Sequence, residues 1–541
     1  MTTRFLIVAV LAAIVFFANI WGTSIYILDE AKNATCAKEM YQRGDLVVPT
    51  FNGNLRTDKP PLHYYFMMLS YHTFGEVTPF TARFFSSLMG VFTVLVTFYF
   101  VRRFTNEGTA FFTGLVLVSS LLFAAQFHLA VPDPYLVFFM TTGCFFLFAF
   151  IHGDSTKNLY LAFVCLSLGV LTKGPVAVVL PVLGVLLYLL LVNRHTLLKK
   201  VWELKPIAAL GILLVIVLPW YVSVYGATDG RWTEEFFLKH NVGRFTSTME
   251  GHGGFPLAAP VIALVALLPS SVFIIQAVKM TWQTREENRF LLFVLCYGAS
   301  ILLFFTFSRT ILPNYISPSL PFLAIVLGYY FDQRLNTQQA LAKPLASLVV
   351  LFFLCVLMTV AAYFGIKQDD SIKELSQLAL YVAILPMGAL AGIVYLFLKK
   401  PYMIIYSITG SFIIFFLVVA FRVFPQLDQK NPVHTSRDIF QDFNGKVYYY
   451  GRFNPSFVFY HTGGVIPKIE SQQQLAEVTN APGDLLILSR KDKAEDLYAY
   501  DQLQPIFEQK DLFEGHTTVI FRKKASALGL SGYPAEGAET P

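Results

Sequence analysis

Long apolar runs constrain the fold of this chain more than any other feature. Its 541 residues contain many stretches of about 18 or more residues with few charges, the length that a helix needs to cross a bilayer. The composition agrees, since 55% of the residues are hydrophobic and only 14% are charged, against roughly 25% charged in soluble domains. The chain is therefore predicted to be an α-helical polytopic membrane protein.

The spacing of the apolar runs predicts how many helices the membrane domain contains. By the length rule we expect about thirteen transmembrane helices. The expected spans are 5–27, 82–101, 110–129, 133–152, 158–172, 175–192, 207–225, 257–279, 290–307, 312–331, 345–365, 377–398 and 402–422. No small-residue cleavage site follows the first span, so we expect it to be retained rather than removed as a signal peptide.

Basic residues fall in alternate short loops and orient these spans. If Arg4 lies in the cytoplasm, every short cytoplasmic loop is basic, as the positive-inside rule expects. The loop residues are Arg102, Arg103, Lys157, Arg194, Lys199, Lys200, Lys279, Arg285, Arg289, Arg334, Lys343, Lys399 and Lys400. An odd number of spans then places the C-terminus outside. Because the net charge of +6 is spread over these loops, it does not indicate nucleic-acid binding.

Two long segments interrupt the membrane domain, and a third follows it. We expect a transmembrane domain over 1–425 that carries a first long loop, 29–79, and a second long loop, 226–256, both outside. Residues 426–524 carry more charge and are predicted to form a small external α/β domain. Its expected strands and helices are Lys446–Tyr450, Asp484–Arg490, Thr517–Lys523, Ser436–Asn444 and Ser471–Thr479. The Ala-, Gly-, Ser- and Pro-rich stretch 525–541 is predicted to be disordered.

The first candidate for chemistry is the acidic pair Asp29-Glu30, directly after the first span. A carboxylate at a membrane surface is well placed to act as a base or as a ligand. A local explanation stands beside this one, because Asp29 is also a good N-cap for a helix over 30–43 that ends at Gly44. The two roles are compatible.

Three further candidates combine charge with proline. In Asp58-Lys59-Pro60-Pro61 the prolines fix the backbone and hold Lys59 at headgroup level, where an ammonium suits a phosphate. The alternative is a lysine that snorkels beside an aromatic belt. Asp133 lies between two prolines, which also fits an N-cap. Lys173, just before Gly174-Pro175, either binds an anion or snorkels outward.

The remaining candidates lie in the second long loop and near the tenth span. Arg244 and His252 lie near aromatic residues, which suits a sugar or phosphate site, and a structural histidine is the alternative. Arg309 precedes Leu312-Pro313-Asn314-Tyr315, and prolines inside a span are tolerated where a cavity or a partner satisfies the freed backbone. Under the predicted topology all of these motifs lie at the external ends of spans. Charges near the bilayer midplane, which mark a transport path, are nearly absent.

Several of these residues recur in one order along the chain. They are Asp29-Glu30-Ala31, Gly44-Asp45, Pro49, Asp58-Lys59-Pro60-Pro61, Ala82-Arg83, Arg309 and Leu312-Pro313-Asn314-Tyr315 with Pro318. This order resembles bacterial lipid A 4-amino-4-deoxy-L-arabinose transferases and, more widely, the protein O-mannosyltransferase-like GT-C glycosyltransferases. The resemblance covers roughly residues 20–330. It implies a GT-C-like helical membrane domain and an external C-terminal domain.

The resemblance also implies roles for individual residues. Asp29 corresponds to an essential aspartate that acts as base on the acceptor or orients it, and Asp133 to an acidic position near the site. Lys59 and Tyr315 match residues that hold the phosphate of the lipid-linked sugar. The other positions expected to bind substrate or phosphate are Arg83, with a structural role as its alternative, Lys173, Arg244 and Arg309.

The sequence departs from the aminoarabinose transferases at a few positions. Asp58 stands where they usually have Glu, Lys32 where they have Arg, and Asn33 where they have Tyr. These differences leave the sugar and the acceptor open. In some relatives a divalent metal lies between the acid before Lys-Pro-Pro and a loop histidine, which makes Asp58 and His252 the metal candidates here.

We therefore predict an inverting glycosyltransferase that moves a sugar from a polyprenyl phosphate to lipid A or another envelope acceptor. The expected location is the bacterial inner membrane, with multiple spans and a periplasmic active site. Its expected partners are membrane lipids, the donor and the acceptor, and no nucleic acid. The alternatives are transfer to Ser or Thr of exported proteins, a lipid or sugar transporter, and a structural envelope protein.

Overall fold

The computed structural model describes residues 2–243, 257–308, 310–336, 341, 343–441, 443–461, 464–512 and 514–524. The chain divides into two compact units, residues 1–427 and 428–541. The first unit is helical, and the second is built on a sheet. This combination confirms the predicted fold class, an α-helical membrane protein with a small α/β domain.

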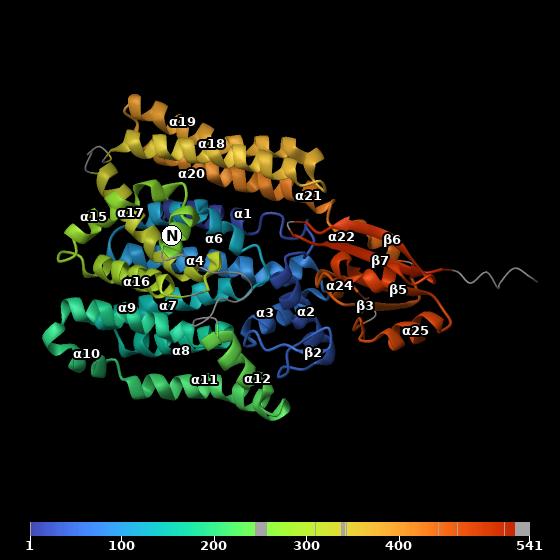
Figure 1. Ribbon diagram of the computed structural model, residues 1–541. Helices are drawn as coiled ribbons and strands as arrows, with labels where there is room; N and C mark the ends of the chain where they lie inside the picture. The colour runs from blue at the N-terminus through green and yellow to red at the C-terminus, as the bar shows by residue number, and fades with distance from the viewer. Residues whose placement is uncertain are drawn as a thin grey trace, which may run out of the picture. The chain divides into compact units, whose positions relative to one another are not determined.

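The first half of the helical unit runs from the N-terminus through the first long loop to the start of the second (Figure 1). It contains α1 (Thr3–Phe16), α2 (Leu28–Arg43), β1 (Thr50–Phe51), β2 (Asn54–Leu55), α3 (Leu62–Phe74), α4 (Pro79–Phe104), α5 (Glu107–Ser119), α6 (Leu121–Gln126), α7 (Asp133–Ile151), α8 (Thr156–Lys173), α9 (Val176–Val192), η1 (Arg194–Thr196), α10 (Leu197–Glu203), α11 (Pro206–Ala227) and α12 (Arg231–Glu234). In Figure 1, α8, α9 and α11 lie along one edge of this unit, and α8 packs against both of the others.

The second half begins with a π-helix and ends in the helices that lie along the opposite edge of the same unit. It contains η2 (Glu235–Gly243), α14 (Ala258–Ala266), η3 (Ser270–Phe273), α15 (Ile274–Gln283), α16 (Arg289–Thr306), η4 (Pro313–Ser319), α17 (Leu320–Asn336), α18 (Pro344–Gln368), η5 (Lys373–Ala383), α19 (Ile384–Phe397), α20 (Pro401–Val418), η6 (Val419–Val423) and α21 (Phe424–Asp428). Figure 1 shows α18, α19 and α20 side by side, with α19 packed against both neighbours.

Helical structure occupies each predicted span, but several spans are not single helices. Within the described residues seven helices are long and apolar enough to cross a membrane, or nine if each of two sharply bent pairs is one span. The first helix ends at Phe16, well short of the predicted boundary at 27. The tenth span opens with the 3₁₀ segment η4, because Pro313 and Pro318 cannot donate α-helical hydrogen bonds. The total of about thirteen spans stays a prediction.

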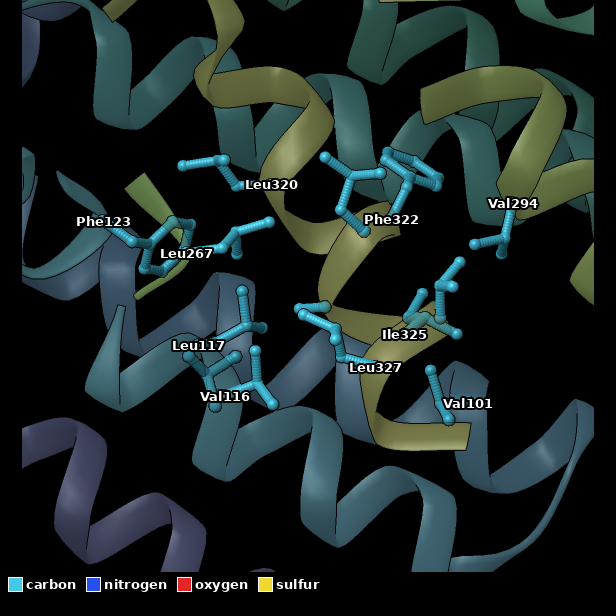
Figure 2. Packing of buried hydrophobic residues seen from close by; sticks show 14 of the residues in the cluster. Val101, Val116, Leu117, Phe123, Leu267, Val294, Leu320, Phe322, Ile325 and Leu327 are labelled. Atoms are coloured by element: carbon cyan, nitrogen blue, oxygen red, sulfur yellow. The ribbon is translucent and has the colours of Figure 1, made fainter. Parts of the chain in front are cut away.

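The core of the helical unit lies where α17 crosses the earlier helices. Figure 2 shows Leu320, Phe322 and Ile325 of α17 among side chains of α4, α5 and α16, all of them buried. The backbones of α5 and α17 come very close, since a Cβ at Gly328 would lie 2.6 Å from the backbone nitrogen of Thr113. Small residues permit such close helix packing in membranes, where the lipid supplies no hydrophobic drive for association.

The first long loop folds into two helices joined by a β-hairpin. The hairpin of β1 and β2 turns at Asn52-Gly53, where both residues have positive φ, as a two-residue hairpin turn demands. The Glu39 carboxylate of α2 accepts from the backbone nitrogen of Asn52 at 2.6 Å and so attaches the hairpin to the helix. The α2 helix ends at Gly44, whose left-handed conformation confirms the predicted end of that helix.

The second unit contains a five-stranded sheet in the order β4-β3-β5-β7-β6. Its elements are α22 (Pro432–Thr435), α23 (Arg437–Gln441), β3 (Lys446–Tyr450), α24 (Ser456–Tyr460), β4 (Lys468–Ile469), α25 (Gln472–Asn480), β5 (Leu485–Arg490), η7 (Lys491–Lys493), α26 (Glu495–Tyr498), β6 (Leu503–Lys510) and β7 (Thr517–Lys523). The strands β4, β3 and β5 are parallel, and β7 pairs antiparallel with β5 and β6.

The three strands predicted in this unit are present, and so is the helix capped by Ser471. The edge strand β6 was not predicted, because its sequence is polar and Pro505 lies at an irregularity of its pairing with β7. The tail 525–541 lies outside the described residues.

Candidate active site

Asp29 presents a carboxylate to solvent at the start of α2. The helix begins at Leu28, and its N-cap is Ile27, which makes no side-chain capping bond. The predicted capping role of Asp29 is therefore wrong, since Asp29 is the second residue of the helix itself. Its side chain is 53% exposed, and the Arg56 guanidinium lies 3.6 Å away. The carboxylate is thus accessible and has a cation beside it.

Glu30, the next residue, points the opposite way, into the protein. Its two carboxylate oxygens accept from Nε and Nη2 of Arg83 at 2.7 and 2.9 Å, and neither side chain reaches solvent to any extent. Arg83 also donates to the backbone carbonyls of Ile20, Thr23 and Ser24. This pair therefore fastens the start of α2 to α4 and to the end of the first span.

The Arg83 guanidinium is thus fully occupied by protein atoms. Besides accepting from Arg83, Glu30 accepts from the backbone nitrogen of Ala130 at 2.9 Å, so the pair also reaches the segment before α7. This placement favours the structural alternative for Arg83 over contact with phosphate.

Arg56 is a buried cation that connects the acidic residues of the first long loop. Its Nη2 lies 3.2 Å from the Asp58 carboxylate and donates to Oδ1 of Asn33 at 3.2 Å. Its Nε donates to the Tyr64 hydroxyl at 3.3 Å. Asn33 comes from α2 and Tyr64 from α3, so Arg56 holds the loop between the two helices.

Lys59 does not snorkel into solvent, because it is only 8% exposed. The prolines that follow it end the extended segment, and Pro61 is the N-cap of α3. His63, the second residue of α3, is completely buried, with its ring 3.9 Å from that of Tyr64. Burial holds the pKa of His63 well below its usual value, and the charges of Lys59 and Arg56 lower it further.

Asp133 and Lys173 form an ion pair between α7 and α8. The Lys173 ammonium lies 2.5 Å from Oδ1 of Asp133, and both side chains are largely buried. Asn314 of η4 donates to the other Asp133 oxygen at 3.1 Å. Asp133 is the first residue of α7, and the N-cap is Pro132, so the predicted capping role of Asp133 is wrong. Because Lys173 pairs with Asp133, it does not snorkel outward.

Tyr315 completes this group, since the Lys173 ammonium lies 5.2 Å from the centre of its ring. That distance allows a cation–π contact. The positive charge of the same lysine also lowers the pKa of His63 in α3. Among the predicted site residues, the structure thus brings together Asp29, Asp58 and Lys59 on one side and Asp133, Lys173 and Tyr315 on the other.

Aromatic residues of the second long loop cover the segment that carries Arg56. Trp232 of α12 is completely buried and donates from Nε1 to the Arg56 carbonyl at 2.8 Å. Glu235 accepts from the Thr57 hydroxyl at 2.8 Å. Trp232 also stacks on Phe236, whose π-helix η2 belongs to a rare type that is frequent at functional sites. The second long loop therefore braces the segment just before Asp58.

Three predicted site residues, Arg244, His252 and Arg309, lie outside the described residues. Within the described part of the chain no group of three or more His, Cys, Asp or Glu side chains could hold a metal ion. Asp58 itself lies beside the Arg56 guanidinium, which competes with a metal for its carboxylate. The described residues therefore give no support to a metal at Asp58.

The structure adds three residues to the site that the sequence analysis did not predict as site residues: Arg56, Asn314 and Trp232. Arg56 resembles any solvated loop arginine in the sequence, and only its burial reveals its role. Asn314 lies inside a motif singled out beside Tyr315, so its proximity to that motif was the available signal. No local sequence pattern links Trp232 to its partner Arg56, because the two lie 176 residues apart in the chain.

Comparisons with known proteins identify relatives of this chain. Residues 6–233 match the family model described as dolichyl-phosphate-mannose-protein mannosyltransferase. An uncharacterized protein of Aquifex aeolicus is 32% identical, over 73% of this chain and 78% of the relative. An undecaprenyl phosphate-α-4-amino-4-deoxy-L-arabinose arabinosyl transferase of Pseudomonas fluorescens is 30% identical, over 66% of this chain and 64% of the relative.

Two solved structures share the fold. ArnT from Cupriavidus metallidurans bound to undecaprenyl phosphate superposes with a TM-score of 0.79 at 19% identity, over 97% of this chain and 99% of that one. The archaeal oligosaccharyltransferase AglB from Archaeoglobus fulgidus gives a TM-score of 0.50 at 11% identity, over 90% of this chain and 69% of that one. The first likeness covers both units of the chain.

Proposed function

Because this chain belongs to the dolichyl-phosphate-mannose-protein mannosyltransferase family of membrane glycosyltransferases, we propose that it transfers a sugar from a polyprenyl phosphate to an acceptor of the bacterial cell envelope. Undecaprenyl phosphate appears in the names of the arabinosyl transferase relatives and is bound in the ArnT structure. The donor class rests on these relatives and on the charges of the site.

The observation that carries the proposal is that two lysines, Lys59 and Lys173, are largely withdrawn from solvent. Lys59 and Lys173 come from different elements, and the positive charge of each lowers the pKa of His63. A phosphate diester would add negative charge beside these lysines, of which Lys173 is already paired with Asp133. Fixed cations in a site that excludes water stabilise a phosphate leaving group far better than solvated ones do.

Asp29 then serves as the general base. Its exposed carboxylate takes the proton of the acceptor hydroxyl while the hydroxyl oxygen attacks the anomeric carbon of the sugar. The bond from that carbon to the phosphate oxygen breaks, and its electron pair leaves with the polyprenyl phosphate. A single displacement inverts the anomeric configuration, and no covalent sugar–enzyme intermediate is needed.

The other residues support these two roles. Asp133 and Asn314 hold Lys173 in place, and Tyr315 lies under its ammonium. Arg83 with Glu30 fixes the helix that presents Asp29. Arg244 and Arg309 remain proposed phosphate ligands, on the family resemblance. His252 and Asp58 remain the proposed metal ligands, and the reaction described here needs no step that uses a metal.

We further propose lipid A or another envelope glycan as the acceptor, in the periplasm and at the inner membrane. The support is the aminoarabinose transfer named for several relatives and the basic loops that alternate along the chain. Transfer to Ser or Thr of exported proteins is the second candidate, because the matched family model describes protein mannosyltransferases.

Purified protein mixed with radiolabelled undecaprenyl-phosphate sugars and candidate acceptors tests the proposal. Asp29→Asn removes the base, and we expect transfer to fall roughly 10²–10⁴-fold, the usual contribution of such a group. Lys59→Ala should raise the KM for the donor. Glu76→Gln, an exposed carboxylate in the same loop, is the matched control and should leave transfer unchanged.

Each outcome of this assay has a definite consequence. Transfer that survives both Asp29→Asn and Lys59→Ala would overturn the site assignment. A wild-type protein that transfers no sugar from any polyprenyl donor, yet moves labelled lipid across vesicles, would favour a transporter. A peptide acceptor used in preference to lipid A would select the second candidate.

A further inference from the structure

A hollow on the second unit of the chain has no part in the proposed reaction. It lies beside the beginning of β3 and β5 and holds about 550 Å³, within the range that small-molecule sites occupy. Its walls come from α23, from the segment that leads into β3, and from β5, β6 and β7. We call it the sheet hollow, because three of its walls are strands of the sheet.

The pairing of the strands shapes the floor of the sheet hollow. Leu486 of β5 and Arg522 of β7 are direct partners in the antiparallel pairing, so their side chains lie next to each other on one face. Ile506 is the extra residue of β6, because the register of its pairing with β7 shifts between Pro505 and Phe507. Such a bulge re-aims a side chain, and bulges are frequent beside functional sites. The side chain of Ile506 lines the sheet hollow.

The aromatic ring of Phe443 lines the sheet hollow, and a neighbouring glycine permits its position. A Cβ at Gly445 would collide with Cζ of this ring and with the backbone oxygen of Asp484. The Arg522 guanidinium lies 5.9 Å from the centre of the same ring, close enough for a cation–π contact. Phe443 is only half-buried, so part of its side chain stays open to a ligand.

Polar groups of both kinds accompany this ring. The Arg522 guanidinium pairs with the Asp484 carboxylate at 2.8 Å, and both side chains stay exposed. Asp438 and Asn444 are exposed too and line the same hollow. The carboxylates accept hydrogen bonds, the guanidinium donates them and the amide does both. Because two acids face one base among these lining residues, the sheet hollow disfavours phosphate groups.

A saccharide matches this combination of groups. A sugar ring has an apolar C–H face, which stacks on an aromatic ring, and a rim of hydroxyls. Those hydroxyls donate to carboxylates and accept from a guanidinium or an amide, and hydrogen bonds to charged groups are the stronger ones. A purely apolar ligand would leave the exposed polar groups unused, and a phosphorylated one would meet two carboxylates.

We propose that the sheet hollow binds an unphosphorylated saccharide, which stacks on Phe443 and whose hydroxyls bind Asp438 and Arg522. A second hollow of about 150 Å³ shares Asp484 and is lined by Tyr448, so a glycan of more than one sugar has room to continue there. None of these residues belongs to the candidate active site, which lies in the helical unit. The use of such a site is to hold a glycan acceptor, and that use, unlike the binding, rests on the proposed function.

The test measures saturation transfer by NMR from the full-length protein to three unphosphorylated disaccharides, namely chitobiose, cellobiose and the glucosamine disaccharide. The protein is kept in a detergent without a sugar headgroup, because a maltoside would compete for the hollow. Inorganic phosphate is added as a competitor. We expect a signal from at least one disaccharide, and we expect excess phosphate to leave that signal unchanged.

Two substitutions test the two kinds of contact. Phe443→Leu keeps the apolar bulk and removes the ring, and Asp438→Asn removes the charge of an exposed side chain. We expect each to weaken disaccharide binding several-fold. Tyr460→Ala and Arg437→Gln are the matched controls, since both residues are exposed and neither lines the sheet hollow, and they should bind as wild type does.

Disaccharide signals that are equally strong in wild type, Phe443→Leu and Asp438→Asn would place the sugar elsewhere and overturn the proposal. The lack of any signal from wild type, or its displacement by phosphate, would overturn it too. The transfer assay decides the proposed function separately. Protein that transfers sugar but binds no disaccharide would refute the sheet hollow alone, whereas protein that binds disaccharides through Phe443 but transfers none would refute the proposed function alone.

Discussion

At the scale of single residues, the adjacent acids Asp29 and Glu30 have different roles. Asp29 is exposed and available to an acceptor, while Glu30 is buried and committed to Arg83. The helical turn at the start of α2 separates them, because successive side chains on a helix point about 100° apart. A sequence shows only the acidic pair, and the burial decides which member is the anchor.

Breaking the anchor should destabilise the protein without touching the reacting atoms. Glu30→Gln leaves the Arg83 guanidinium buried without its charge partner, which costs roughly 3–5 kcal/mol when one partner of a buried pair is removed. We expect a clearly lower unfolding temperature in detergent, measured by intrinsic fluorescence.

An exposed ion pair provides the control for this substitution. Arg103→Ala removes the partner of Asp154 at the surface, where such a pair is worth about 0–1 kcal/mol, and should barely change the unfolding temperature. An equal loss of stability in Glu30→Gln and Arg103→Ala would contradict the anchoring role of Glu30.

The sequence allowed the residue types of the site to be predicted, but not their partners. Lys59, Asp133, Lys173 and Tyr315 were identified by local motifs. Asp133 and Lys173 lie forty positions apart in the chain, and they pair only because α7 packs against α8. No local sequence pattern encodes that packing. Arg56 was missed for the same reason, because its acidic partners reach it only after folding.

At the scale of elements, α12 and η2 of the second long loop brace the first long loop. The contact depends on Trp232, whose indole packs with Trp220 and Phe236 and whose Nε1 holds the Arg56 carbonyl. The braced segment leads directly into Asp58 and Lys59. The position of Lys59 therefore depends on an element that is far away in sequence.

Trp232→Phe separates the hydrogen bond from the aromatic packing. The phenyl ring keeps most contacts but leaves the Arg56 carbonyl without its donor, a loss of about 1 kcal/mol. We expect a several-fold higher KM for the polyprenyl donor with little change in kcat. The assay is transfer at varied donor concentration.

The exposed Trp202 of α10 provides the matched control, and Trp202→Phe should leave KM unchanged. A Trp232→Phe enzyme that loses kcat at unchanged KM would contradict a role for this brace in donor binding.

Helices and strands were predictable where the hydrophobic periodicity of the sequence and its capping residues indicate the same boundaries, and less so elsewhere. The apolar runs located the helices, and Ser471 located the start of α25. The edge strand β6 escaped because one of its faces is polar and Pro505 interrupts its pairing. The predicted capping role of Asp29 was wrong because α2 begins at Leu28, two residues before the expected start at Glu30.

At the scale of the whole molecule, two units share one chain, and the helical unit is the one that contains the proposed site. The division follows composition, because charge rises where the apolar runs end. The basic loops and the parity of the predicted spans predict which side of the membrane each loop faces, and this prediction can be tested without any substrate.

A reporter enzyme that works only outside the cytoplasm tests the predicted sidedness. Fused after Phe424, it should be active, because the predicted odd number of spans would place this point in the periplasm. Fused after Lys200, within a basic loop, it should be inactive, and a fluorescent protein that folds only in the cytoplasm should show the reverse. Activity after Lys200 but not after Phe424 would invert the proposed orientation.

The burial of the two lysines and the exposure of Asp29 have a practical consequence for inhibition. On the proposed reaction, largely buried lysines bind the donor phosphate, whereas the acceptor meets an exposed carboxylate. A lipid phosphonate that binds in place of the donor would block every acceptor alike, whereas a compound shaped like one acceptor would leave the others in use. Exchanging residues around Asp29 is correspondingly the route to redirect the enzyme, since the donor-binding residues need not be changed.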